Sequence, residues 1–184
     1  MTEYRTTLTT QTPIAITIGN FDGIHLGHQR LLHQVRTMAQ ELGCTPAIVT
    51  FLPHTLMVVR PQLDIYYLTT LNEKLALARQ YGHVADNIVI KFTLEVAALS
   101  AEEFMDNLCA HFNVKGLVVG SDFSLGRNRM GNAEFLVDYG KRHQIQVEAM
   151  LLEESQQVRI SSTRIRELVS EGQIAEANTL LGHP

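Results

Sequence analysis

The chain has 184 residues, of which 45% are hydrophobic and 18% are charged. This length suits one domain of about 100–200 residues, and the apolar content excludes an intrinsically disordered chain. The formal net charge of -4 argues against a protein that binds nucleic acid over its whole surface. Two cysteines cannot build a small disulfide-stapled scaffold.

The cysteines and the chain's N-terminus indicate where the protein works. Cys44 and Cys109 are far apart and lack the spacing of a metal site, so we expect reduced thiols. The first residues lack the basic and apolar regions of a signal peptide. No apolar run approaches the ~18 residues of a membrane span. We therefore expect a cytoplasmic protein that binds small molecules, needs no membrane or nucleic acid, and shows no sign of an obligate protein partner.

The first third of the chain predicts two strands and one long helix. A short β-branched run at residues 14–18 predicts a buried strand. Apolar residues then recur at helical spacing, from a start near Gly27 or His28 to a stop at Gly43. Residues 46–51 predict the second strand. Residues 52–67 hold two prolines and no clear period, which predicts a long loop.

Two capping boxes mark the helices of the middle third. Thr70 with Glu73 predicts a helix through about residue 81, and Ser100 with Glu103 predicts one through about residue 112. The rest of the chain predicts strands at 87–92, 115–120 and 146–151, a polar loop at 121–132, a helix at 133–143, and one or two helices over 161–181.

Strands that alternate with helices are typical of an α/β fold. We predict one domain over residues 1–184, with a mostly parallel sheet of about five strands and helices on both faces. Ligands in such folds lie beyond the carboxyl ends of the strands, at a switch in strand order. The informative side chains should therefore follow strands directly.

The turn after the first predicted strand reads Gly-Asn-Phe-Asp-Gly-Ile-His-Leu-Gly-His over residues 19–28. Its glycines allow close backbone approach, and the free N–H groups of the next helix form an anion site. His25 and His28 are three residues apart, so neutral imidazoles can donate to one bound group. The spacing fits neither GxxxxGK[ST] nor GxGxxG. A glycine-rich turn with incidental histidines, or a zinc pair without a third ligand nearby, remains open.

A second polar motif, Arg-Ile-Ser-Ser-Thr-Arg-Ile-Arg, occupies residues 159–166. Its hydroxyls can cap a helix and donate to phosphate oxygens, and its arginines can bind phosphate through two nitrogens at once. Ser162, Thr163 and Arg166 fall within one helical turn, so one pyrophosphate can meet all three. The alternative is a plain N-cap with solvated arginines.

Both motifs resemble a known family. His25-Leu26-Gly27-His28 is similar to the HxGH signature of HIGH-type nucleotidyltransferases. The longer run 19–28 resembles the N-terminal FMN adenylyltransferase module of the bacterial bifunctional riboflavin kinase/FAD synthetase family. Residues 160–166 resemble that superfamily's ISSTxIR motif, which binds the β- and γ-phosphates of ATP. The resemblance implies a Rossmann-like nucleotidyltransferase fold.

Two further segments resemble the flavin side of that family. Residues 51–55 are similar to its Phe-x-Pro-His-Pro segment, with Thr55 where proline is usual. Residues 120–126 are similar to Gly-x-Asp-Phe-x-Phe-Gly, with Leu125 in place of the second phenylalanine. The first segment can equally be a proline-anchored strand exit. Arg127 and Arg129 either touch a ligand or are solvated.

The resemblance implies that the FMN phosphate attacks the α-phosphorus of ATP in line, giving FAD and pyrophosphate. Mg²⁺ is expected with ATP, and no protein metal site is predicted. Catalytic roles fall to His25, His28 and Arg166. The predicted ATP site comprises Gly19, Asn20, Phe21, Asp22, Gly23, His25, Gly27, His28, Gly120, Asp122, Arg159, Ser161, Ser162, Thr163 and Arg166. The predicted FMN site comprises Phe51, Pro53, His54, Asp122 and Phe123.

The resemblance covers nearly the whole chain, from Ile14 to Pro184. The riboflavin kinase barrel of the bifunctional proteins is expected to be absent, whether the chain is a stand-alone enzyme or an excised module. Three alternatives stay open. They are the same fold with another acceptor, such as phosphopantetheine or a nicotinamide or glycerol phosphate; a non-catalytic flavin or nucleotide binder; and an α/β interaction module.

Overall fold

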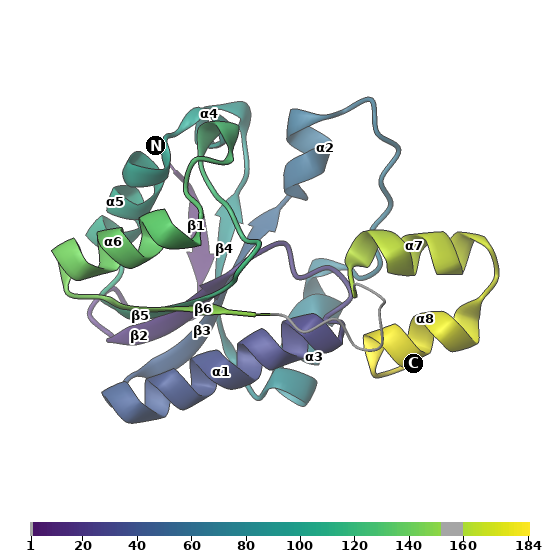
Figure 1. Ribbon diagram of the computed structural model, residues 1–184, viewed down its shortest axis with the longest axis horizontal. Coiled ribbons are helices and arrows are strands. Elements are labelled where there is room, and N and C mark those ends of the chain that lie inside the picture. The colour runs from purple at the N-terminus through teal and green to yellow at the C-terminus, as the bar shows by residue number, and fades with distance from the viewer. Residues whose placement is uncertain (1, 152–159) are drawn as a thin grey trace.

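A computed structural model describes residues 2–151 and 160–184 of the chain. Its described part contains a six-stranded sheet in the order β1-β4-β3-β2-β5-β6 (Figure 1). Strands β2 to β6 are parallel to one another, and β1 pairs antiparallel with β4. The strands are β1 (Tyr4–Thr6), β2 (Ile14–Ile18), β3 (Thr45–Leu52), β4 (Asp86–Lys91), β5 (Val114–Gly120) and β6 (Gln146–Met150). The predicted α/β class is confirmed.

Helices cover both faces of this sheet (Figure 1). Helices α1 and α3 lie on one face and contact each other, while α5 and α6 lie on the other. The helices are α1 (Leu26–Leu42), α2 (Thr55–Val59), α3 (Leu71–Gly82), α4 (Leu94–Ala98), α5 (Ala101–His111), α6 (Ala133–His143), α7 (Ser162–Ser170) and α8 (Ile174–Leu181), with a 3-10 turn, η1, at Arg127–Arg129. No described helix is both long and apolar enough to cross a bilayer.

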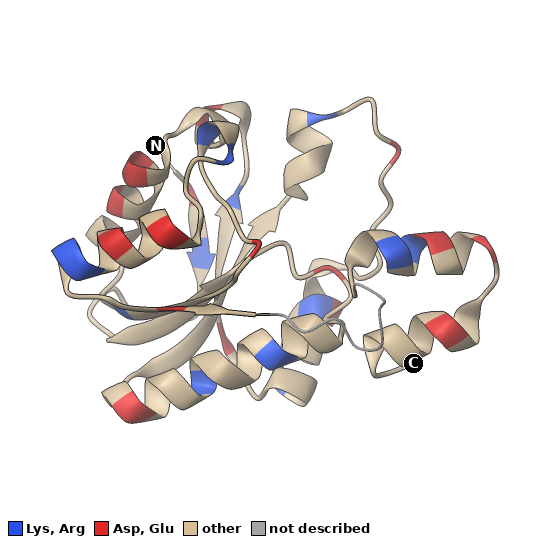
Figure 2. Cartoon of the chain, in the orientation of Figure 1, with Lys and Arg blue, Asp and Glu red and all other residues tan. Residues whose placement is uncertain are grey.

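The central strand β2 is buried on both faces, as expected of a parallel strand between two helix layers. Ile14, Ile16 and Ile18 face the cluster built with α5 and α6. Ala15 faces the cluster built with α1. The surface helices carry charges of both signs, visible along α6 and α7 in Figure 2. The core therefore fixes β2, and with it the turn that follows its carboxyl end.

The predicted helix caps are confirmed. Thr70 with Glu73 and Ser100 with Glu103 form reciprocal capping boxes at the starts of α3 and α5. Gly43 ends α1 in the left-handed conformation. The boundaries of the predicted strands hold to within one residue.

Three short elements differ from the prediction. The sheet has a sixth strand, β1, which is three residues long and pairs at the edge with β4. The predicted long loop after β3 contains α2, and α4 follows β4. Each of these helices has five residues, too few to display a helical period. Their starts depend on side-chain caps, His54 for α2 and Thr93 for α4.

The strand order reverses at β2, whose neighbours are β3 on one side and β5 on the other. Such a switch point opens a crevice beyond the carboxyl ends of the strands. The C-terminal helices α7 and α8 pack on each other through Ile165, Leu168 and Ala177. Gln29 of α1 ties them to the crevice by donating to the carbonyls of Ile24 and Leu181, at 2.9 Å each.

Candidate active site

A cavity of about 310 Å³ occupies this crevice. It is bounded by the turn after β2, the first turn of α1, the exits of β3 and β5, and the start of α7. Predicted site residues line most of its wall, namely Gly19, Asn20, Phe21, His25, His28, His54, Gly120, Asp122, Phe123, Ser161, Ser162, Thr163 and Arg166. The fold thus brings the two sequence motifs to one cavity.

The two histidines of the first turn lie face to face. Their ring centroids are 3.6 Å apart and the planes differ by 16°. His25 is the N-cap of α1, and its Nδ1 accepts the backbone N–H of His28 at 3.3 Å. Because a backbone N–H can only donate, the proton of a neutral His25 lies on Nε2. Burial lowers the pKa of His25 from 6.5 to about 4.

His28 is also neutral near pH 7. Burial, then the nearby His25 and Lys74, hold the pKa of His28 well below 6.5. Both imidazoles are therefore uncharged and able to donate a hydrogen bond at a helix N-terminus, where the dipole favours an anion. This agrees with the charge state expected from the sequence.

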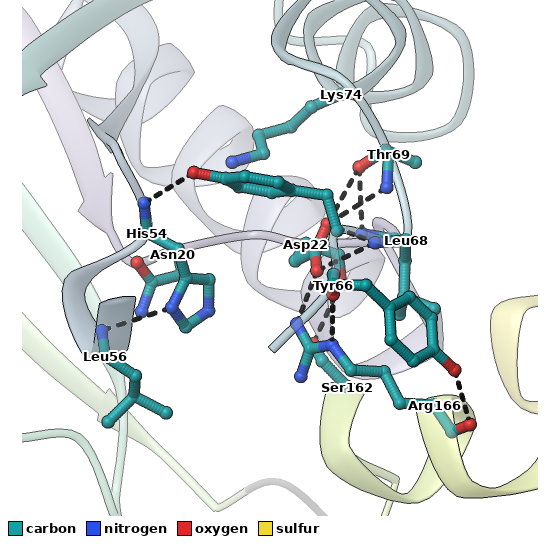
Figure 3. A network of polar contacts seen from close by, with 12 residues as sticks. Asn20, Asp22, His54, Leu56, Tyr66, Leu68, Thr69, Lys74, Ser162 and Arg166 are labelled. Carbon is teal, nitrogen blue, oxygen red and sulfur yellow. Dashed lines mark hydrogen bonds and ion pairs between the residues drawn. The ribbon is translucent and has the colours of Figure 1, made fainter. Parts of the chain in front are cut away.

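Asp22 joins the two motifs through its polar contacts (Figure 3), but it does not line the cavity. The carboxylate is fully buried. It accepts the backbone N–H of Leu68 at 3.0 Å and both the N–H and hydroxyl of Thr69 at 3.1 Å. It also forms an ion pair with Arg166. The carboxylate therefore binds loop 66–69 and Arg166 of α7, and it does not face a ligand.

Arg166 is held on a second side by Tyr66. The Nε of Arg166 donates to the Tyr66 carbonyl at 2.8 Å, and the Tyr66 hydroxyl donates to the Arg166 carbonyl at 2.6 Å. The Ser162 hydroxyl donates to the Asp22 carbonyl at 2.9 Å. These contacts dock the start of α7 on the turn after β2 (Figure 3).

Four predicted ATP-site residues fall elsewhere. Asp22 is turned inward for the reason just given. Gly23 lines a separate cavity beside Leu181 and His183. Gly27 is buried inside the first turn of α1 and does not line the cavity. Arg159 lies outside the described residues.

A second cavity, of about 680 Å³, adjoins the first and shares Gly19, Asn20, Leu56, Asp122 and Phe123 with it. Its wall is largely apolar, with Phe51 and Phe92 in edge-to-face contact. Arginines from two loops also line it, namely Arg60, Arg127 and Arg129. Of the predicted FMN-site residues, Phe51, Asp122 and Phe123 line this cavity. His54 lines only the first cavity, and Pro53 is exposed and lines neither.

The structure gives Thr55 a specific role at the boundary between the cavities. The Thr55 backbone N–H donates to Asn20 Oδ1 at 3.2 Å, and Asn20 Nδ2 donates to the Thr55 hydroxyl at 2.9 Å. A proline there would lack both the N–H and the hydroxyl. Asn20 is therefore fixed by a pair of contacts that this chain's threonine makes possible.

The loop beyond β5 is braced against α5, and Gly126 is its tightest point. Gly126 has φ +74, and an added Cβ would lie 2.5 Å from the Ala101 nitrogen. We expect Gly126→Ala to lower the free energy of unfolding by about 3 kcal/mol or more, since steric overlap adds to the left-handed backbone cost. Gly172 has φ +75 and no atom within 4 Å of an added Cβ. Gly172→Ala should thus cost only about 1–2 kcal/mol. Urea unfolding measures both, and equal losses would contradict the tight packing of Gly126.

Histidine burial predicts acid destabilisation. Burial, then the charge of Arg166, lowers the pKa of His54 from 6.5 to about 4. Above pH 6.5 neither the folded nor the unfolded state binds this proton. Between pH 6.5 and 4 only the unfolded state does, so stability is lost over that window. We expect His54→Asn, which keeps an N-cap acceptor, to reduce this loss by roughly 1–3 kcal/mol. Urea unfolding at pH 7.5 and 5 measures the free energy lost on acidification. His33→Asn, at an exposed position, is the control. If His54→Asn and the wild type lose the same free energy of unfolding, the predicted contribution of His54 is refuted.

Lys74 is a buried charged residue behind the site, and none of the sequence motifs includes it. It lies on α3 and is 2% exposed, and its charge helps to lower the pKa of both His28 and His54. The signal was present in the sequence, because Lys74, Ala78 and Gly82 repeat every fourth residue and form the buried stripe of that helix. A lysine on such a stripe indicates an internal charge.

Comparisons with known proteins agree with this geometry. The family model described as FAD synthetase matches residues 7–164. An FAD synthetase of Listeria monocytogenes is 37% identical over 171 residues, which cover 92% of this chain and 68% of that protein. The bifunctional riboflavin kinase/FMN adenylyltransferase of Escherichia coli strain K12 is 34% identical over 170 residues, covering 92% of this chain and 54% of that protein. The chain spans about half the length of such bifunctional relatives.

A solved structure has the same fold. It is described as a macrolide-efflux protein from Streptococcus pneumoniae and is 28% identical, with a TM-score of 0.86. The similarity covers 95% of this chain and 58% of that one.

Proposed function

Because this chain belongs to the FAD synthetase family, we propose that it transfers the adenylyl group of ATP to FMN, giving FAD and pyrophosphate. The observation that carries the proposal is the pair of adjoining cavities. One is lined by neutral histidines, hydroxyls and Arg166, and the other is larger and mostly apolar. Their common wall at Gly19, Asn20 and Asp122 is where an ATP phosphate and an FMN phosphate would meet.

The proposed step needs no side-chain nucleophile. An FMN phosphate oxygen attacks the α-phosphorus of ATP, a new P–O bond forms, and the bond from the α-phosphorus to the bridging oxygen breaks. The electron pair leaves on pyrophosphate. An ionised phosphate attacks without losing a proton, so catalysis consists of placement and charge stabilisation. The Nε2–H groups of His25 and His28 donate to phosphate oxygens. Ser162, Thr163 and Arg166 receive the leaving pyrophosphate.

We place the flavin ring in the larger cavity. The rings of Phe51, Phe92 and Phe123 offer flat apolar surface to a planar ring system. Arg127 and Arg129 stand where they can meet polar substituents of the flavin or its phosphate. Arg129 is already oriented, since its Nε donates to the Ser124 hydroxyl at 2.8 Å.

Mg²⁺ fits the donor set of the shared wall. Asp122 offers a carboxylate between the two cavities, and Mg²⁺ typically takes one or two carboxylates together with phosphate oxygens and water. Asp122 would hold the ion beside the nucleotide. When bound, Mg²⁺ neutralises phosphate charge. A separate group, Glu102, Asp106 and His143, has ligand atoms within 4.8 Å of one another, but Arg142 already binds Glu102 at 2.7 Å.

We place this reaction in the cytoplasm, where ATP is available, and propose that it needs no partner protein or nucleic acid. Cys44 and Cys109 are free thiols, as suits a reducing compartment.

A direct assay separates this function from its alternatives. The protein is incubated with ATP, Mg²⁺ and one acceptor at a time, namely FMN, phosphopantetheine, nicotinamide mononucleotide or glycerol phosphate. FAD formed from FMN is the expected result. Adenylylation of another acceptor instead would overturn the assignment of substrate. Tight FMN and ATP binding without any product would make the chain a non-catalytic binder.

A further inference from the structure

Asn20 lies on the common wall of the two cavities, and strand β3 fixes its backbone. The Gly19 N–H donates to the Val49 carbonyl at 3.0 Å, and the Thr50 hydroxyl donates to the Asn20 carbonyl at 3.1 Å. Thr50 is fully buried, so water does not compete for its bond. These contacts hold the main chain just beyond the carboxyl end of β2. They leave the orientation of the Asn20 side-chain amide to be set by other groups.

Thr55 sets that orientation through two hydrogen bonds. It is the first residue of α2, so its backbone N–H has no acceptor within the helix, and Asn20 Oδ1 accepts it at 3.2 Å. Because a backbone N–H can only donate, this contact identifies which end of the amide is the oxygen. Asn20 Nδ2 donates one hydrogen to the Thr55 hydroxyl at 2.9 Å. One residue at the exit of β3 therefore holds both ends of the amide.

The amide nitrogen of Asn20 carries a second hydrogen. Among the residues that the structure describes, the Thr55 hydroxyl is the one hydrogen-bond partner of Nδ2. Because an amide group is planar, fixing the oxygen and one N–H also fixes the direction of the other N–H. We propose that Thr55 is a positioning residue, which holds Asn20 so that this second N–H donates to the phosphates at the common wall. The inference rests on the proposed function, which brings two phosphates to this wall.

The position of Asn20 determines which kinetic constant Thr55 should affect. The phosphates meet at the common wall only when both cavities are filled, so this hydrogen bond belongs to the reacting complex. Such a contact raises kcat and adds little to the affinity for ATP or FMN measured alone. The arrangement is particular to this chain, because the proline that is usual at position 55 in the family has neither the N–H nor the hydroxyl.

Thr55→Val removes the hydroxyl and keeps the backbone N–H and the branched shape of the side chain. We expect kcat for FAD formation to fall roughly tenfold, because a donor that is displaced from the reacting atoms loses much of its effect. Thr55→Ser keeps both contacts and should retain the wild-type kcat. Thr10→Val, at an exposed threonine that lines neither cavity, is the matched control. Weaker FMN binding with an unchanged kcat in Thr55→Val would mean that Thr55 only shapes the larger cavity, and would overturn the proposal.

A double-mutant cycle shows whether Thr55 acts through Asn20. Asn20→Ala removes the amide, so kcat should fall at least as far as in Thr55→Val. In the Asn20→Ala background, Thr55→Val should cost nothing further, because the side chain that it positions is gone. A second loss of the same size in that background would show that Thr55 acts independently of Asn20, which contradicts the inference.

Proton–nitrogen NMR of the side-chain amides gives a readout that needs no turnover. The Asn20 signals are assigned by their disappearance in Asn20→Ala. We expect them to shift when ATP, Mg²⁺ and FMN are added to the wild type, and to shift much less in Thr55→Val. If the wild-type signals stay in place although both nucleotides bind, the amide meets no phosphate and the inference fails, even if Thr55→Val does not fold. If the signals shift yet no FAD forms, the proposed function fails and the positioning of Asn20 by Thr55 stands.

Discussion

His28→Ala is expected to lower turnover about 100-fold while leaving the affinity for FMN nearly unchanged. His28 lines the smaller cavity at the N-terminal turn of α1 but does not line the larger one. In the proposed reaction this ring donates an N–H to phosphate oxygens, on which negative charge shifts during the transfer. Loss of one such donor costs ~3 kcal/mol in the transition state, or about a factor of 100 in rate. Steady-state kinetics of FAD formation, with FMN binding titrated separately, measure both quantities.

The matched control for this prediction is His33→Ala. His33 lies on the same helix but on its exposed side, so its removal should change neither kcat nor FMN binding. Near-wild-type turnover in His28→Ala would show that the ring does not serve the transferring phosphate. An equal fall in kcat and in FMN affinity would mean that His28 contacts the flavin nucleotide in its ground state.

Much of the fold could be predicted because its long elements carry local sequence signals. The β-branched run of β2 spans five residues, and each capping box of α3 and α5 joins two residues that are three apart. The short elements do not. Strand β1 exists because its backbone pairs with β4. Helix α2 depends on His54 as a cap, and neither signal extends over a full period.

The site also has parts that a local pattern predicts and parts that only the folded chain brings together. His25 and His28 are three residues apart, so one local turn brings them together. The pairing of Asp22 with Arg166 joins residues 144 positions apart, and no local pattern predicts it. The inward turn of Asp22 follows from the backbone donors of loop 66–69, which only the folded chain presents to it. Lys74 was missed for a different reason, since a capping box next to it explained the segment without reference to burial.

Asp22 connects the two motifs of the site, which are far apart in sequence. Its buried charge needs compensation, because an isolated carboxylate in the interior is costly. Arg166 supplies the opposite charge, and loop 66–69 supplies the donors. The guanidinium is thus fixed on one side before any nucleotide arrives. If ATP binds as proposed, this preorganisation lowers the entropic cost of ordering α7 around it.

Arg166→Ala is therefore expected to have two separable effects. It should weaken ATP binding roughly 10–100-fold, because a charge-assisted contact to phosphate is worth ~1.5–3 kcal/mol. It should also lower the free energy of unfolding by about 3–5 kcal/mol, because Asp22 is left buried without its cation. The affinity for FMN alone should barely change. Arg166→Lys should also weaken ATP use, since an ammonium cannot copy the two-nitrogen fork, but less than Arg166→Ala does, because the positive charge is kept. Isothermal titration with each nucleotide and urea unfolding measure these effects.

A double variant separates the two roles of Arg166. In Asp22→Asn with Arg166→Ala no buried charge is left unpaired, so much of the lost stability should return, whereas ATP affinity should stay low. Arg164→Ala, which removes a partly exposed arginine paired with Glu167 on the same helix, should alter stability by at most about 0.5 kcal/mol. If the double variant regains ATP affinity together with stability, Arg166 acts only by neutralising Asp22 and does not touch the nucleotide. If Arg166→Ala instead loses FMN affinity and keeps ATP, the two substrates have been placed in the wrong cavities. We expect the double variant to recover stability while ATP binding stays weak. That result requires a guanidinium that binds Asp22 on one edge and the phosphates on the other.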